Sequence, residues 1–190
     1  MDHKSIVAAL LALLLLAGCG MRPSSREEVI PPAPPPAASA EQGLAEITVR
    51  GAGLRLKAPD GWAFAEQPEY VQAQCRPRGS EADLPVILVQ SDSVKTDLTL
   101  RAIVSGFTRQ IPRALENPVV TRDEEVPIGL QGVESYEVAC RGRLEGHAVV
   151  MTQRILRKGG WLVVITFMAP ASELQRYEPA FRQLLATLAW

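Results

Sequence analysis

The chain has 190 residues, a formal net charge of −1 and 47% apolar residues, which suits one globular domain with additional segments. Its 20 basic side chains are balanced by 21 acidic ones, so it lacks the overall positive field that draws nucleic acid or anionic lipid to a protein. We therefore expect no nucleic-acid partner, and any membrane association must have another origin.

The N-terminus has the pattern of an export signal. A short polar start containing Lys4 precedes an unbroken apolar run from Ile6 to Ala17. This run is shorter than the roughly 20 residues that a helix needs to cross a membrane, but it matches the apolar region of a signal peptide. The alternative is a buried N-terminal helix, which would have to be buried on every side because the run has no amphipathic period. The pattern predicts a signal peptide over residues 1–18.

The next feature is Leu16-Ala17-Gly18-Cys19, which resembles the lipobox of bacterial lipoproteins. In that family the peptide is cut before the cysteine, here between Gly18 and Cys19; the thiol receives a diacylglycerol and the new amino group is usually acylated. Acyl chains contribute about 0.8 kcal/mol per buried CH₂, so two or three give a stable anchor. The resemblance implies lipid attachment at Cys19, against the alternative of an unmodified cysteine. Gly20, rather than aspartate, implies the outer membrane facing the periplasm in a Gram-negative organism.

Residues 19–44 are predicted to form the lipidated cysteine and a Pro/Ala-rich tether. They include the run Pro31-Pro32-Ala33-Pro34-Pro35-Pro36, and proline runs favour extended polyproline II at ~3.1 Å per residue. The segment has too few large apolar residues to form a core. A spacer is favoured over a proline-motif ligand for a recognition domain. The globular domain is then predicted over residues 45–190.

Alternating apolar and polar residues predict the strands of this domain. The first two are Glu46–Val49 and Leu54–Lys57, and Pro59-Asp60-Gly61 predicts a turn. Later strands are predicted at Tyr70–Arg76, Pro85–Val89, Val119–Glu125, Val133–Cys140, His147–Leu156 and Trp161–Met168. The last of these is apolar on both faces, so neither face of the sheet is expected to meet water there.

Two helices are predicted, one before and one after the last four strands. The first has an N-cap at Thr96-Asp97 and ends at Pro112, with an apolar stripe at helical spacing: Leu100, Ile103, Val104, Phe107 and Ile111. The second begins near Ser172, and Pro179 is expected to break or restart it. This order predicts an α+β fold in which helices cover both faces of an antiparallel sheet, a three-layer α/β/α sandwich.

The order of elements resembles the PsbP-like, DcrB-related domains of bacterial exported proteins. The resemblance lies in the mid-chain helix, the four-strand meander and three local patterns: Leu54-x-Leu56, Pro59-x-Gly61-Trp62, and an end helix with Phe181 and Leu184-Leu185. It implies an α/β/α sandwich with a non-enzymatic role such as scaffold, assembly factor or chaperone. It carries over no catalytic residues.

A search for reactive groups finds little. His147 is the only histidine beyond the predicted signal, and no Gly-x-Ser-x-Gly pattern accompanies it. One histidine without Cys-x-x-Cys does not make a usual zinc site, and Gly51-x-Gly53 lacks the third glycine of a dinucleotide loop. Asp123-Glu124-Glu125 alternates across a strand, which favours a solvated edge over a paired acid–base site. The sequence therefore predicts no catalytic residue, no metal and no cofactor.

Cys75 and Cys140 are both predicted to point inward, by alternation with their neighbours. Outside the cytoplasm they would form a disulfide if the geometry allowed it, with a stabilisation on the order of 4 kcal/mol. Two unpaired buried thiols are the alternative, and the sequence leaves both open. A disulfide would gather four arginines into a candidate anion-binding patch: Arg76, Arg78, Arg141 and Arg143. Four independent charges that keep turns hydrated are the favoured alternative.

Together these features predict a lipid-anchored, non-enzymatic binding, scaffold or assembly module of the cell envelope. Its expected partners are the membrane, through the N-terminal lipid, and another envelope protein or an amphipathic ligand. A second hypothesis is a carrier or chaperone that holds an apolar or amphipathic ligand or protein segment between helix and sheet. A third is a hydrolase that uses carboxylates or Tyr136, which would require two inward carboxylates in one cleft.

Overall fold

The computed structural model describes residues 44–66 and 72–190. The predicted signal peptide, Gly18, Cys19 and nearly all of the predicted tether lie outside the described residues. The elements follow in this order: β1 (Glu46–Thr48), β2 (Arg55–Lys57), β3 (Trp62–Glu66), β4 (Ala73–Pro77), β5 (Val86–Ser93), α2 (Leu100–Thr108), α3 (Ile111–Ala114), β6 (Glu116–Glu125), β7 (Glu134–Leu144), β8 (His147–Lys158), β9 (Trp161–Pro170), the 3₁₀ helix η1 (Ala171–Glu173) and α4 (Leu174–Ala186).

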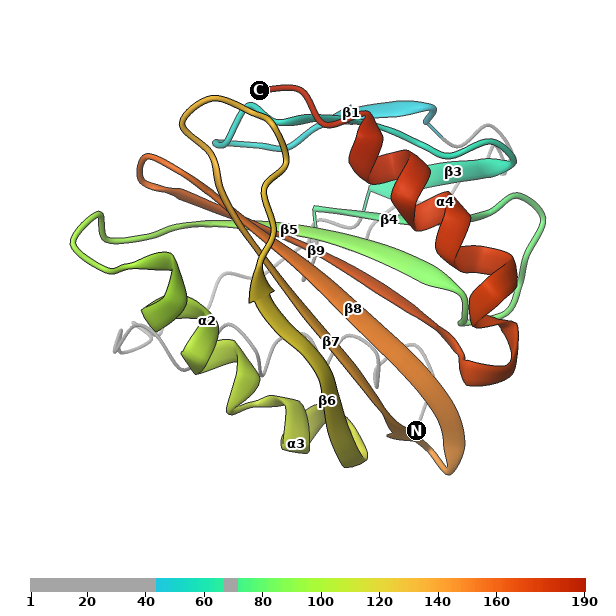
Figure 1. The fold of residues 1–190 in the computed structure, drawn as a ribbon. Coiled ribbons are helices and arrows are strands. Elements are labelled where there is room, and N and C mark those ends of the chain that lie inside the picture. The colour runs from blue at the N-terminus through green and yellow to red at the C-terminus, as the bar shows by residue number, and fades with distance from the viewer. Residues whose placement is uncertain (1–43, 67–71) are drawn as a thin grey trace, which may run out of the picture.

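Seven strands form one antiparallel sheet in the order β3-β4-β5-β9-β8-β7-β6, and β1 pairs with β2 in a separate two-stranded sheet. The last four strands form a meander of consecutive hairpins. Strand β5 pairs with β9 rather than with β6, because α2 and α3 carry the chain from the middle of the sheet to its far edge. Early and late segments of the domain therefore lie side by side in the sheet (Figure 1).

The central strands present a separate core on each face. Val86 and Leu88 of β5 belong to the cluster that packs against α2 and α3. Their neighbours Ile87 and Val89 point the other way and belong to the cluster with α4, β1 and β2. Strand β9 is buried from Leu162 to Ala169, as expected for a strand apolar on both faces.

The predicted α+β class with an antiparallel sheet is confirmed. The fuller prediction of helices over both faces, a three-layer α/β/α sandwich, goes beyond the observed packing. Helix α4 shares its face with the β1–β2 sheet, and β6 is exposed along nearly its whole length.

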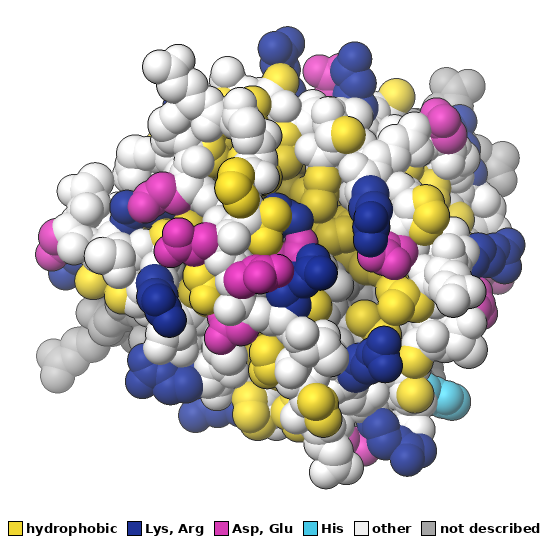
Figure 2. All heavy atoms as spheres, viewed as in Figure 1, with side chains coloured by type: hydrophobic (Ala, Val, Ile, Leu, Met, Phe, Trp, Pro, Cys, Tyr) yellow, Lys and Arg dark blue, Asp and Glu magenta, His cyan; other side chains and the backbone are white. Residues whose placement is uncertain are grey.

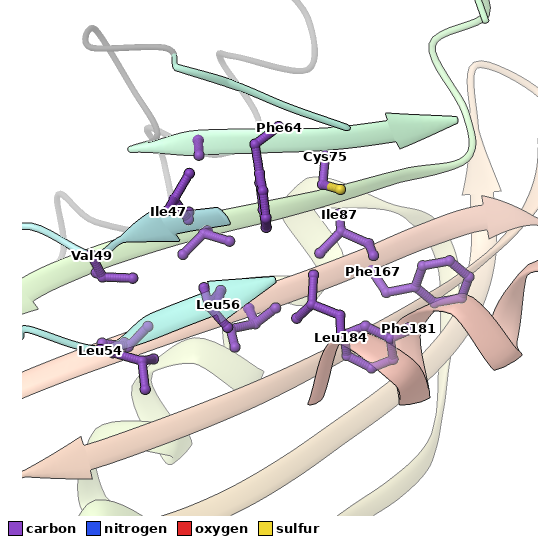
Figure 3. Close-up of a cluster of buried hydrophobic side chains, with 14 of the residues drawn as sticks. Ile47, Val49, Leu54, Leu56, Phe64, Cys75, Ile87, Phe167, Phe181 and Leu184 are labelled. Carbon is purple, nitrogen blue, oxygen red and sulfur yellow. The ribbon is translucent and has the colours of Figure 1, made fainter. Parts of the chain in front are cut away.

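The core beneath α4 is closed by the end of the chain. In this core the rings of Phe167 in β9 and Phe181 in α4 stack (Figure 3), and their centroids lie 5.2 Å apart. After α4 the chain returns to β2, where Ala189 and Arg55 exchange backbone hydrogen bonds of 2.8 and 3.2 Å. The indole Nε1 of Trp190 then donates to the carbonyl of Ala52 at 2.5 Å.

Both predicted helices form, with different ends. Thr99 caps α2, and its Oγ1 accepts a hydrogen bond of 3.2 Å from the backbone N–H of Ala102. The apolar stripe divides between two helices, because α2 ends at Thr108 and α3 begins separately at Ile111. Helix α4 continues through Pro179, so the predicted break was wrong. Its packing on the sheet outweighs the cost of an internal proline.

Candidate functional site

Of the two alternatives left open for Cys75 and Cys140, the structure has the unpaired one, because both cysteines are free and buried. Cys75 lies on β4 and Cys140 on β7, with β5, β9 and β8 between them. Four strand spacings of about 4.8 Å separate them by roughly 19 Å, whereas a disulfide needs Cα atoms within about 7 Å. The two thiols also belong to the cores of opposite faces. Both point inward as predicted, but toward different layers.

The four arginines of the candidate anion-binding patch are not brought together. Arg76 and Arg78 lie at β4, where each donates to a carbonyl of a neighbouring segment. Arg141 and Arg143 lie on β7, where Arg143 donates to the carbonyl of the β7–β8 turn at 2.6 Å. Because β4 and β7 are separated by three strands, this patch does not exist, and the alternative of independent charges describes the structure.

The structure instead joins one carboxylate to two guanidinium groups on the α4 side of the sheet. Glu137 of β7 lies opposite Arg154 of β8, and its Oε2 accepts a hydrogen bond from Arg154 Nη2. Its Oε1 accepts a hydrogen bond of 2.6 Å from Nη1 of Arg122 on β6. The side chains of Glu137 and Arg154 are 8% and 9% exposed, whereas that of Arg122 is 52% exposed. This charged cluster therefore leads from a buried ion pair to a cation at the surface.

The exposed end of the cluster faces both β6 and α4. Nε of Arg122 lies 3.3 Å from Glu124, its neighbour on the same side of β6. The hydrogen bond to Glu137 raises the pKa of Arg122, and attraction to Glu137, Glu124 and Glu178 of α4 adds to the rise. Glu178 in turn accepts a hydrogen bond of 2.6 Å from Arg182, one turn along α4. The charges on β6 and α4 thus act on one another across the face of the sheet.

Figure 2 shows that the middle of this face is hollowed, with hydrophobic side chains on its floor and side chains of both charge types meeting there. Two apolar side chains from the β6–β7 loop, Ile128 and Val133, pack partly buried against the core of this face. Leu174 and Tyr177 of α4 do the same. The charged cluster therefore lies among partly exposed apolar groups, a mixture typical of a surface that recognises another molecule.

The buried part of the cluster is incompletely satisfied. Nη1 of Arg154 donates to Oγ of Ser135 at 3.5 Å. Nε of Arg154 is buried and has no hydrogen-bond partner among the described residues. An unpaired buried donor costs free energy, so this nitrogen lowers the stability that the ion pair contributes.

The groups considered for catalysis lie apart from this cluster. Tyr136 belongs to the opposite core, beneath α2. Burial raises its pKa, and a hydrogen bond to Asp123 adds to the rise, so the phenol stays protonated. Glu124 and Glu137 do share a face, but Glu124 is 59% exposed and both oxygens of Glu137 bond arginines. The two inward carboxylates that a hydrolase would require are not found in this cluster.

Other candidate sites are limited within the described residues. In residues 44–66 and 72–190, no group of three or more His, Cys, Asp or Glu side chains is placed to hold a metal ion. None of the described helices has both the length and the apolar character to cross a membrane. An open pocket of about 300 Å³ lies between β1–β2 and the end of the chain and is lined by Glu46, Arg55, Leu56, Lys57, Thr187 and Ala189.

Sequence analysis did not single out Glu137, Arg154 or Arg122. One signal was present, because Gln153 and Arg154 interrupt an otherwise apolar stretch of β8. Such an interruption marks a charge that the fold must accommodate, but it does not reveal the partner on another strand.

Comparison with known proteins finds likeness at the level of structure. No protein-family profile matches the sequence, and no curated protein matches it. The solved structures similar to it include three from different organisms: CyanoP, the cyanobacterial PsbP of Synechocystis sp. PCC 6803 (TM-score 0.56, 11% identity, 82% of this chain and 99% of that one); LpqN of Mycobacterium tuberculosis (0.55, 12%, 72% and 82%); and Mog1p of Saccharomyces cerevisiae (0.54, 12%, 76% and 93%). At these identities the likeness shows the fold alone. The domain has a PsbP-like fold.

Proposed function

We propose that this protein is a lipid-anchored, non-enzymatic binding or scaffold module of the cell envelope, and that its binding face is the hollow beside α4. LpqN is described as involved in cell envelope biogenesis, and Mog1p as a Ran-binding protein. Roles of this kind on one fold support a binding function here, without indicating the same partners.

The observation that carries the binding face is the ion pair between Glu137 and Arg154. Burying two charges costs desolvation, and replacing such a pair with apolar residues is often neutral or stabilising. This sequence retains the pair next to an apolar core and links it to the exposed Arg122. Arg154 fixes the carboxylate of Glu137, and this carboxylate orients the guanidinium group of Arg122. The surface therefore presents a cation and a carboxylate in fixed positions for recognition.

The anchor and the location rest on the N-terminal sequence. Leu16-Ala17-Gly18-Cys19 follows an export-type apolar run, and Gly20 supports the outer membrane facing the periplasm in a Gram-negative cell. A Pro-rich spacer after Cys19 would hold the binding face away from the lipid surface.

Photo-crosslinking in intact envelopes tests the binding face. A crosslinking residue replaces Glu178, a partly exposed residue of α4 that faces Arg122, and the matched control replaces Arg101, an exposed residue of α2 on the other side of the sheet. A discrete adduct at position 178 and none at position 101 supports the proposal. Equal labelling at both positions, or none at 178, argues against it.

Fractionation tests the anchor separately. Cys19→Ser should move the protein from the membrane to the soluble fraction, because the lipid-bearing thiol is lost. A variant that stays membrane-bound would show that another feature holds the protein there.

An amphipathic ligand is the second candidate for the same hollow. It is favoured by the partly exposed apolar side chains of Ile128 and Val133 in the β6–β7 loop, on the same face as the charged cluster. Displacement of a fluorescent fatty-acid analogue, lost in Ile128→Ser but kept in Arg101→Ala, would support a carrier role. Absence of displacement would leave a protein partner as the occupant.

A further inference from the structure

The two edges of the seven-stranded sheet are treated differently by the fold. At the β3 edge, Leu44 pairs with Phe64, and the two residues exchange backbone hydrogen bonds of 2.9 and 3.0 Å. At the opposite edge, β6 pairs only with β7 among the described residues. Strand β6 is also twice as long as β3, with 10 residues against 5. Within residues 44–66 and 72–190, the fold therefore covers part of the short edge with its own backbone and leaves the long edge unpaired.

The hydrogen-bond pattern identifies which backbone groups of β6 face outward. The N–H of Val126 donates to the carbonyl of Ser135, and the register is regular from Arg122 to Glu125. In an antiparallel pair, bonded and non-bonded positions alternate. The backbone groups of Arg122 and Glu124 therefore face β7, and those of Asp123 and Glu125 face away from the sheet. These outward groups can pair with an added strand.

The side chains of β6 indicate what kind of strand fits. Val119 and Val120 are 62% and 43% exposed, and as neighbours in a strand they point to opposite sides of it. A bulge follows them. Beyond the bulge, Asp123, Glu124 and Glu125 bring three carboxylates to this edge. A second copy paired over this stretch would place carboxylates against carboxylates, which is unfavourable, whereas a basic strand would place opposite charges across the new ladder.

We propose that β6 binds an extended basic segment of an envelope protein as an eighth strand of the sheet. The segment would bond the outward backbone groups of Asp123 and Glu125, and its lysine or arginine side chains would pair with the carboxylates of this edge. Strand β6 also carries Arg122, so the same partner would run along the border of the hollow. The inference rests on the proposed binding function, and it names the chemistry of the partner.

Hydrogen exchange of the full chain in detergent tests strand addition, with an acetylated peptide of alternating lysine and valine as the probe. The peptide should slow exchange at the amides of Asp123 and Glu125. A peptide of alternating glutamate and valine is the control and should leave both amides unchanged. If both are already protected before any peptide is added, the chain covers its own edge and the proposal fails.

Paired substitutions separate backbone pairing from charge. Glu125→Ala removes only the carboxylate, whereas Glu125→Pro also removes the outward N–H, a change that edge strands tolerate. Glu125→Pro should weaken peptide binding about tenfold beyond Glu125→Ala. Equal weakening by the two variants would indicate charge attraction without strand addition and overturn the proposal. Thermal unfolding verifies that both variants keep the fold.

The outcomes distinguish this inference from the proposed function. Slowed exchange together with an unlabelled position 178 in envelopes would support strand addition and argue against the hollow. Labelling at position 178 with unchanged exchange at Asp123 and Glu125 would support the hollow and overturn strand addition.

Discussion

Glu137 and Arg154 face each other directly across β7 and β8, and the ion pair between them is buried on the α4 side of the sheet. Glu137 satisfies its second oxygen with Arg122, but Arg154 Nε has no partner among the described residues. The attraction between the two charges therefore has to offset a large desolvation cost, although the set of hydrogen bonds around the pair is incomplete. This makes the pair sensitive to the loss of either member.

Glu137→Ala should lower the free energy of unfolding by about 3–5 kcal/mol, because it leaves Arg154 charged and buried without its partner. Urea unfolding measures the change. Arg182→Ala is the control, since it breaks an exposed pair with Glu178 and should cost less than about 1 kcal/mol. The double variant Glu137→Leu with Arg154→Met should recover most of the loss; a double variant as unstable as the single one would contradict the argument.

The stability of the protein should fall at alkaline pH because of its two buried thiols. Burial raises the pKa of Cys75 from 9.0 to about 12 and that of Cys140 to about 11. The unfolded chain releases these protons from about pH 9, whereas the folded chain keeps them. The stabilisation is therefore complete below pH 9 and is lost as the pH rises toward 11, by about 1.4 kcal/mol per pH unit for each thiol.

Urea unfolding from neutral pH to about pH 11 checks this dependence. The variant with Cys75→Ala and Cys140→Ala should show a flatter decline, and each single variant an intermediate one. Identical slopes in all four proteins would show that the thiols do not titrate as argued.

Gly51 and Gly53 form a matched pair for a packing test. Both have positive φ, but a Cβ on Gly51 would lie 2.2 Å from the ring of Trp161, whereas Gly53 has open space around it. Gly53→Ala should cost about 1–2 kcal/mol from backbone strain alone, and Gly51→Ala about 1–3 kcal/mol more from overpacking. Thermal unfolding measures both. In a Trp161→Ala background, the two glycine variants should differ less in the stability they lose. If the difference between them stays the same, the ring of Trp161 is not its cause.

Thr99→Ala should lower the free energy of unfolding by about 1 kcal/mol, because it removes the side-chain acceptor at the start of α2. Thr96→Ala, at the cap predicted from sequence, should change it by less than about 0.5 kcal/mol. Chemical denaturation of the two variants gives the comparison. A larger effect at Thr96 would mean that the helix begins earlier than the structure places it.

The meander could be predicted from sequence because its information is local. Predicted strands at His147–Leu156 and Trp161–Met168 match β8 and β9 closely, since alternation and glycine turns such as Gly159 act within a few residues. Strand β3 was missed because Ala63 and Ala65 have low strand propensity. They are also apolar, so the buried Trp62 and Phe64 do not alternate with polar residues.

Partner identity could not be predicted, because it depends on strand order. The alternation of apolar and polar residues correctly predicted that Cys75 and Cys140 point inward. It carries no information on how many strands separate the two cysteines. Glu137 and Arg154 meet only because the β7–β8 register sets them opposite each other, 17 residues apart in the chain. Pairwise register is a property of the folded sheet, so the charged cluster was not visible in either strand alone.

The closure of β2 by Ala189, with Trp190 bonded to Ala52, also sets a time order for folding. Strands β1 and β2 are made first, yet their layer is complete only when residues 187–190 arrive. In a chain that leaves a ribosome or a translocation channel N-terminus first, β1 and β2 therefore stay incompletely packed until nearly all of the domain has emerged. We therefore expect this domain to become protease-resistant only after nearly all of it has emerged.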